Sequence, residues 1–224
     1  MTLRDGAGAP PQDHARRIVV VSAGLSDPSS TSLLAKLLAE ATTTALTALR
    51  DPRSPSSSGT EVEVTHVELR PLAHALTDHL LTGFSSGDLA KAQEAVAQAD
   101  AVIAVTPVFS ASYSGLFKTF FDVLETGALD GTPVLVAATA GTARHSLVLE
   151  HALRPLFTYL HAVVVPTGVF AASEDFGGAD LEKRVQRAAG ELASLVAARP
   201  HTARLDQFDR DLAAMGDFSD LLKG

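Results

Sequence analysis

Short runs of β-branched and apolar residues alternate along this chain with longer segments whose apolar residues recur at helical spacing. The first pattern predicts strands over 17–22, 61–69, 101–105, 134–138 and 162–165. The second predicts helices over 32–49, 73–82, 88–99, 115–125, 146–160 and 181–198. Continuous apolar strands joined through helices indicate a parallel sheet covered on both faces. The chain is therefore predicted to be an α/β protein with a doubly wound, five-stranded parallel sheet in the order 2-1-3-4-5.

The length of 224 residues suits one such domain, which we expect to span 17–198. Residues 1–16 mix Gly, Pro, Asp and Gln ahead of the first apolar run, and are predicted to be disordered. Residues 199–224 place Leu205, Phe208, Leu212 and Met215 at helical spacing among acidic residues. This tail is predicted to be an acidic helix that packs on a neighbouring subunit or covers the site, with disorder as the alternative.

Charge and cysteine content exclude several classes of function. The net charge is -8 and no Lys/Arg cluster is present, so nucleic acid is not an expected partner. The chain has no cysteine, which excludes disulfides and thiolate chemistry and favours a cytoplasmic location. No apolar stretch is long enough for a bilayer, so no membrane association is expected. His74 and His79 do not share a helical face, and no metal site is predicted.

In a doubly wound sheet, ligands bind beyond the carboxyl ends of the strands, where the strand order reverses. The loop after 17–22 reads Ser22-Ala-Gly-Leu-Ser-Asp-Pro-Ser-Ser-Thr-Ser32 and leads directly into a helix. The helix N-terminus supplies unpaired N–H groups, and four successive residues, Ser29, Ser30, Thr31 and Ser32, add hydroxyls, which together predict a phosphate site. The alternative is a plain N-cap, for which one Ser would suffice. The loop lacks the Lys of a triphosphate-binding loop, so a flavin mononucleotide phosphate fits it better.

The loop after 101–105, which Pro107 is expected to end, reads Thr106-Pro-Val-Phe-Ser-Ala-Ser-Tyr-Ser-Gly115. Its small hydroxylated residues, its Pro and its aromatic ring allow the backbone to lie against a flat ligand ring. An ordinary connection from strand to helix is the alternative.

The loop after 134–138 reads Thr139-Ala-Gly-Thr-Ala-Arg-His145, with a cation and an imidazole at its far end. Its small residues again allow close approach of backbone to a ligand. His145 is a candidate for contact with cofactor or substrate, although a lone histidine also serves as a cap or a packing residue.

These three loops, with Gly-Leu-Phe-Lys-Thr-Phe-Phe-Asp122 after the second and Ser146-Leu-Val-Leu-Glu-His-Ala-Leu-Arg-Pro-Leu156 after the third, resemble the NADPH-dependent FMN reductases, which are flavodoxin-like. The stretch from Gly141 is similar to an actinobacterial subgroup associated with luciferase-like monooxygenases. The resemblance covers about 17–198. It departs from the family at Ala23-Gly-Leu-Ser26, where the family has Gly-Ser-x-Arg, and at Phe109, where the family has Tyr. The missing Arg leaves open whether NADPH or NADH is preferred.

The resemblance implies an FMN-binding homodimer or homotetramer that passes hydride from NADPH or NADH to flavin and supplies reduced FMN to a monooxygenase. It places the phosphate on the first loop, the ring edge on the second and the pyrimidine end on the third. The cofactor itself carries out hydride transfer, so no catalytic residue is expected. The candidate cofactor-binding residues are Ser22, Ser29, Thr31, Ser32, Pro107, Val108, Phe109, Ser110, Thr139, Gly141, Thr142, Arg144 and His145.

Two other functions remain open on the sequence. A quinone or azo-dye reductase of the same fold differs only in what enters above the flavin ring. A non-enzymatic flavodoxin-type electron carrier would oxidise NADPH slowly, whereas a reductase oxidises it rapidly and faster with added FMN.

Overall fold

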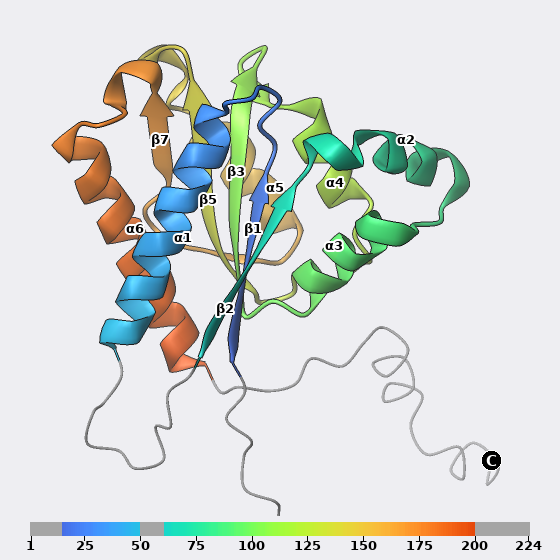
Figure 1. Cartoon of the computed structure of the whole chain (residues 1–224), viewed down its shortest axis with the longest axis horizontal. Coiled ribbons are helices and arrows are strands. Elements are labelled where there is room, and N and C mark those ends of the chain that lie inside the picture. The colour runs from blue at the N-terminus through green and yellow to red at the C-terminus, as the bar shows by residue number, and fades with distance from the viewer. Residues whose placement is uncertain (1–14, 50–60, 200–224) are drawn as a thin grey trace, which may run out of the picture.

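The computed structural model describes residues 15–49 and 61–199. A sheet of parallel strands runs through its centre in the order β2-β1-β3-β5-β6 (Figure 1). These strands are β1 (Arg16–Ser22), β2 (Val62–Glu68), β3 (Ala101–Phe109), β5 (Pro133–Ala140) and β6 (Val163–Val164). With the short additional strands set aside, this is the predicted order 2-1-3-4-5, and the flavodoxin-like doubly wound fold is confirmed.

Helices cover both faces of the sheet (Figure 1). On one face lie α1 (Ser30–Ala48) and α6 (Ala179–Ala198), and on the other lie α2 (Ala73–Thr82), α3 (Gly87–Ala97), α4 (Gly115–Asp122) and α5 (Arg154–Tyr159). Strand β1 shows why both faces must be covered. Ile18 and Val20 belong to the core with α1 and α6, whereas Val19 and Val21 belong to the other core. Side chains alternate across a strand, so a continuous apolar run buries both faces.

Strand β3 does not stop before Pro107, contrary to prediction. It continues to Phe109 and turns back through β4 (Ser112–Tyr113), which pairs antiparallel with Val108 and Phe109. The carbonyl of Val105 accepts from Ala23 N–H on the β1 side. Backbone groups of successive residues face opposite sides of a strand, so Pro107, two residues after Val105, faces the β1 side as well. At Pro107, however, β3 has already passed the end of β1. The missing N–H of Pro107 therefore removes no ladder bond.

The helix predicted over 146–160 is interrupted. The predicted range contains a π-helical turn η3 (Leu149–Leu153) followed by α5, and a separate turn η2 (Ala143–His145) lies just before it. Pro155 is the second residue of α5 and has no N–H to continue a regular helix, and its ring would clash with a carbonyl four residues earlier. The wider π turn precedes it, which places the proline in the first turn of a new helix.

The sheet edge beside β5 is occupied by two short strands. β6 pairs with Pro133 and Val134, whereas β7 (Val169–Ala172) pairs with 137–140 at the other end of β5. The sequence analysis predicted one strand over 162–165 and missed β7. Pro166, between the two, separates them into a tandem pair.

The described residues include the first strand and the last helix of the predicted domain. The expectations for 1–14 and 200–224 lie outside the described residues, β1 begins at Arg16, and α6 ends at Ala198 as predicted. Across the described part of the chain, we find no helix with the length and apolar character needed to cross a membrane.

Candidate functional site

The three predicted loops meet at the carboxyl edge of the sheet, at the top of Figure 1. Ser22, at the end of β1, is in register with Val105 of β3. Pro107 of β3 is in register with Thr139 of β5. Because neighbouring parallel strands end together, residues about a hundred positions apart in sequence form one rim.

The loop after β1 packs its backbone against the first turn of α1. Ser29 is the N-cap of the helix, and its hydroxyl accepts from Ser32 N–H at 3.2 Å. A Cβ atom at Gly24 would lie 2.0 Å from Ser29 Oγ and 3.2 Å from Ser32 Oγ. Only glycine fits here, and its absent side chain leaves the hydroxyls and the helix N-terminus accessible from the loop side.

A cavity of about 810 Å³ opens at this point, which we call the α1 cavity. Its walls include Gly24, Ser29, Ser32, Lys36, Glu68 and Arg70. The volume falls within the range of roughly 300–1,000 Å³ that is usual for ligand sites. Hydroxyl groups, a helix N-terminus and two cations in one cavity fit a phosphate group.

The sequence analysis missed Lys36 and Arg70, because it searched for cations only within the loop. Lys36 lies four residues after Ser32 on α1, which places both on the same side of the helix. Arg70 follows β2, whose carboxyl end lies at the same edge as that of β1. The helical spacing and the parallel neighbour strand were the signals that could have found them.

A chain of hydroxyl groups connects three elements beside the α1 cavity. Ser22 Oγ lies 3.2 Å from Ser32 Oγ, and Ser32 Oγ donates to Glu68 Oε2 at 3.0 Å. These residues come from β1, α1 and β2 in turn. Ser22 is 2% exposed, so its hydroxyl faces the Ser32 hydroxyl and not solvent.

Thr31 has a different partner from its neighbours. Its Oγ1 lies 2.8 Å from Oγ1 of Thr139, and both residues are buried. This bond joins the first turn of α1 to the end of β5. The structure thus places Thr31 in the core of the site and connects it to another predicted residue, while the wall of the α1 cavity comes from Ser29 and Ser32.

The predicted ring-side residues lie on the β3–β4 hairpin. Pro107 and Val108 are partly buried, whereas Phe109 is 47% exposed and Ser110 is exposed at the turn. Ser110 and Ala111 have φ of 50° and 65°. Two consecutive residues at positive φ form the type of turn that joins strands by two residues, and non-glycine residues are strained there.

The loop after β5 is the most exposed part of the site. Gly141, Thr142 and Arg144 are exposed and His145 is partly buried. Thr142 caps the turn that follows, because its hydroxyl accepts from Arg144 N–H at 3.1 Å. This hydrogen bond fixes the backbone of the loop, and the Arg144 side chain faces solvent.

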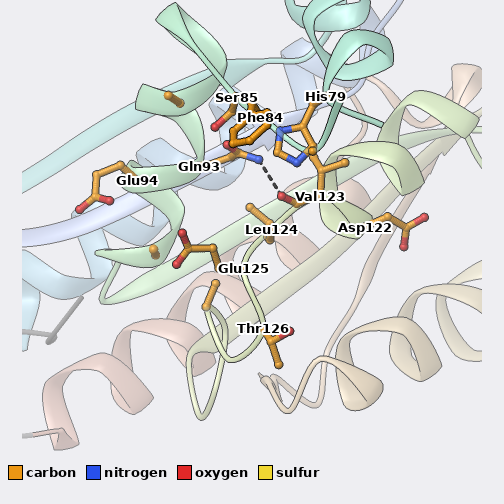
Figure 2. A pocket seen from close by; sticks show the side chains of 14 residues that line it. His79, Phe84, Ser85, Gln93, Glu94, Asp122, Val123, Leu124, Glu125 and Thr126 are labelled. Atoms are coloured by element: carbon orange, nitrogen blue, oxygen red, sulfur yellow. Dashed lines mark hydrogen bonds between the residues drawn. The ribbon is translucent and has the colours of Figure 1, made fainter. Parts of the chain in front are cut away.

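A second cavity, of about 620 Å³, lies away from this edge between α2, α3 and the segment after α4 (Figure 2). Its walls carry the carboxylates of Glu94, Asp122 and Glu125, and Gln93 crosses it to donate to the Val123 carbonyl at 2.7 Å. Lys118, in the family-like motif, pairs with Asp122 as α4 spacing allows. Acidic walls repel a phosphate, so we assign no flavin to this cavity.

Ionisable groups add little chemistry to the described part of the chain. Burial raises the pKa of Glu191, but hydrogen bonds from Thr167 and the charge of Arg187 outweigh burial and hold that pKa below its ordinary value. This carboxylate lies on α6, away from the rim. Within 15–49 and 61–199, no group of three or more His, Asp and Glu side chains is placed to hold a metal ion.

Comparison with known proteins places the chain among flavin reductases. It is 38% identical over 160 residues to the NADH-dependent FMN reductase SfnF of Pseudomonas putida, which is 71% of this chain and 79% of that protein. It is 34% identical over 194 residues to an FMN reductase (NADPH) of Pseudomonas aeruginosa, 84% of this chain and 97% of that protein.

Among solved structures, an oxidoreductase from Corynebacterium diphtheriae is 49% identical and superposes with a TM-score of 0.76, covering 84% of this chain and 100% of that one. The profile of the NADPH-dependent FMN reductases matches residues 16–177, which include all three loops of the rim. The chain therefore belongs to the NADPH-dependent FMN reductase family, and it is an NAD(P)H:flavin oxidoreductase that uses FMN.

Proposed function

We propose that the carboxyl edge of the sheet holds FMN, with its phosphate in the α1 cavity and its ring between the β3–β4 hairpin and the loop after β5. Reduced FMN is then released to a monooxygenase. The observation that carries this placement is the α1 cavity itself, where Gly24, the N-terminus of α1, Lys36 and Arg70 come together.

The phosphate end is supported by geometry and charge. Ser29, Ser30 and Ser32, at the N-terminus of α1, line the cavity that Gly24 leaves open. Lys36 and Arg70 add positive charge from α1 and from the chain after β2. Hydrogen bonds to an anion of this kind contribute about 1.5–3 kcal/mol each, enough to distinguish FMN from riboflavin.

The ring end is supported by shape. Pro107 and Val108 offer backbone and apolar side chain at the rim, and the tight turn at Ser110 and Ala111 holds Phe109 outward. When bound, the flavin ring accepts a hydride from the nicotinamide. The chain's task is then to align two flat rings and exclude water, and this requires no acid or base from the protein.

The nicotinamide donor is NADPH or NADH, and the two curated relatives above differ in this respect by name. Arg144 is the exposed cation of the loop after β5, and we place it beside the phosphates of the nucleotide. Arg144→Ala should then raise the KM for the donor by about tenfold with kcat unchanged, because a charge contact present in both ground and transition state affects binding alone. Stopped-flow or steady-state oxidation of each donor measures this effect. A fall in kcat without a change in KM would contradict it.

Release to a monooxygenase and homo-oligomer formation complete the proposal, and both are implied by the resemblance of the loops and of 141–156. Exposed apolar side chains at the ring side, Phe109 and Leu147, favour a second copy that covers the flavin. A reducing cytoplasm suits the cysteine-free chain and supplies both donors. Sedimentation that finds a monomer throughout the working concentration range would contradict the assembly.

The test of the function is steady-state oxidation of NADPH and NADH with FMN, FAD, riboflavin and a quinone as acceptors. We expect saturable FMN binding and a rate that rises with free FMN. A faster rate with the quinone, at fixed bound FMN, would identify a quinone reductase instead. Slow oxidation with every acceptor would identify an electron carrier.

A further inference from the structure

We infer that Glu68 competes with the FMN phosphate for the Ser32 hydroxyl, and so keeps FMN exchangeable. The inference rests on the proposed function, since it assumes that the phosphate enters the α1 cavity. Glu68 lies among cations and hydroxyl groups in the wall of the α1 cavity. A carboxylate at that position does not help to bind an anion, and the inference gives it a role.

The hydroxyl groups beside Glu68 have few protons to share. A serine hydroxyl has one proton to donate, and an ionised carboxylate can only accept. Ser32 Oγ gives its proton to Glu68 Oε2 at 3.0 Å. Ser22 Oγ, at 3.2 Å, therefore donates to Ser32 and does not accept from it. The Ser22 proton points toward Ser32 and the Ser32 proton points toward Glu68. Ser32 therefore presents only lone pairs to a phosphate oxygen, which is itself an acceptor.

The backbone of Glu68 is held in place by the sheet. Glu68 is the last residue of β2 and lies in register with Ser22 of β1. The next backbone N–H, that of Leu69, donates to the Ser22 carbonyl at 2.9 Å. The sheet therefore fixes the backbone of Glu68 beside that of Ser22, which keeps the Glu68 carboxylate within reach of the Ser32 hydroxyl.

The wall of the α1 cavity carries both positive and negative side chains. The charged residues in the wall of the α1 cavity are Asp27, Lys36, Glu68 and Arg70. Lys36 and Arg70 attract a phosphate, whereas Glu68 is bonded to the very hydroxyl that the phosphate would use. Binding must break that bond and bring a dianion close to a carboxylate, and both changes weaken FMN without affecting riboflavin.

This arrangement suits a reductase that gives its flavin away. An enzyme with FMN as a permanent group gains from every phosphate contact, whereas one that supplies reduced FMN to another enzyme must release it on the time scale of turnover. Glu68 would lower phosphate affinity while leaving the ring contacts intact.

The test replaces Glu68 by its neutral isostere. Glu68→Gln removes the charge, and its amide can donate to Ser32 Oγ, which frees the Ser32 proton for the phosphate. We expect the FMN dissociation constant to fall by about tenfold and the FMN dissociation rate to slow by a similar factor, with the riboflavin constant unchanged. Flavin fluorescence titration and stopped-flow displacement measure these quantities. Glu68→Ala, which removes charge and acceptor together, should change FMN in the same direction.

Two controls separate a bond through Ser32 from a general charge effect. Glu63→Gln removes an exposed carboxylate from the same strand, and should leave the FMN constant unchanged. Combining Glu68→Gln with Ser32→Ala should abolish most of the gain, because the freed proton is then absent. A gain that persists in full in the Ser32→Ala background would overturn the proposed route.

The outcomes also distinguish this inference from the proposed function. If the wild-type chain binds FMN no better than riboflavin, the phosphate does not lie in the α1 cavity and the proposed function fails. If it prefers FMN, and Glu68→Gln and Glu68→Ala either leave that preference unchanged or reduce it, the inference alone fails. Equal weakening of both flavins, with a lower unfolding temperature, would show that Glu68 only holds the sheet edge together.

Discussion

The α1 side of the site is cross-linked, whereas the ring side is an exposed hairpin and loop. On the α1 side, hydroxyl bonds join α1 to β1 and β2 through Ser32 and to β5 through Thr31. On the ring side, within 15–49 and 61–199, β3 and β4 pair only with each other beyond Pro107, and Phe109 is exposed. Tight geometry at one end suits a small charged group, and an open surface at the other suits a flat ring that must also admit a second substrate.

This difference predicts how substitutions act. A change in the wall of the α1 cavity should alter FMN and riboflavin differently, because only FMN carries the phosphate. A change on the ring side should alter both flavins alike. The four predictions below test that contrast, from the largest expected effect to the smallest.

Gly24→Ala should have the largest effect. The new Cβ would lie 2.0 Å from Ser29 Oγ, so the loop and the N-cap must move apart. Overpacking of this kind costs about 1–3 kcal/mol, which corresponds to a loss of FMN affinity of about tenfold to a hundredfold. Titration with FMN and riboflavin measures it. The matched control is Gly190→Ala on α6, away from both sides of the site, where a Cβ meets no atom within 4 Å and the affinities for FMN and riboflavin should be preserved.

Thr31→Val should destabilise the fold by about 1–3 kcal/mol, because it leaves the buried Thr139 hydroxyl without its partner. The ratio of FMN to riboflavin dissociation constants should stay near that of the wild type. Thr31→Val with Thr139→Val should recover most of the stability, since removing both partners is nearly neutral. Urea unfolding measures each step. Selective loss of FMN in the single variant would instead place the Thr31 hydroxyl on the phosphate, as the sequence alone suggested.

Ala111→Gly should stabilise the chain by about 1 kcal/mol, because glycine accepts the φ of 65° that alanine resists. The measurement is again urea unfolding, with Ala143→Gly in the next loop as a control that should not stabilise. If the strained turn helps to position the ring, both flavins should weaken together by a small factor. A change confined to FMN would mean that the two sides of the site are not separate.

Glu191→Gln, remote from both sides, should give the smallest effect on binding and a pH-dependent effect on stability. Thr167 donates to this carboxylate from its N–H and its hydroxyl, each at 2.7 Å. Because the pKa of Glu191 is lowered in the fold, its stabilisation is present above the ordinary pKa and is lost as pH falls through the native pKa. The stability gap between wild type and variant should therefore close in acid. Thermal unfolding across pH measures the gap, and a constant gap would contradict the prediction.

The layered architecture could be predicted from the sequence because it depends on the local pattern of apolar residues. Apolar runs such as 17–22 must be buried on both faces, and the periodicity of 32–49 must face one of them. These two facts lead to a parallel sheet, and the sheet brings Ser22, Pro107 and Thr139 to one edge. The strand end predicted at Pro107 was wrong, because a missing N–H removes a ladder bond only where a neighbouring strand lies opposite it, and β1 ends before that point.

The sequence by itself determined the fold class, the strand order and the three loops that form the rim, since each follows from residues within a few positions of one another. The tertiary structure alone decided the partner of each hydroxyl. Thr31 and Thr139 are 108 positions apart and Ser32 and Glu68 are 36 apart, yet each pair lies within hydrogen-bond distance. A hydroxyl has one proton, so its role depends on which acceptor the packed elements bring nearest, and neither spacing nor composition carries that information.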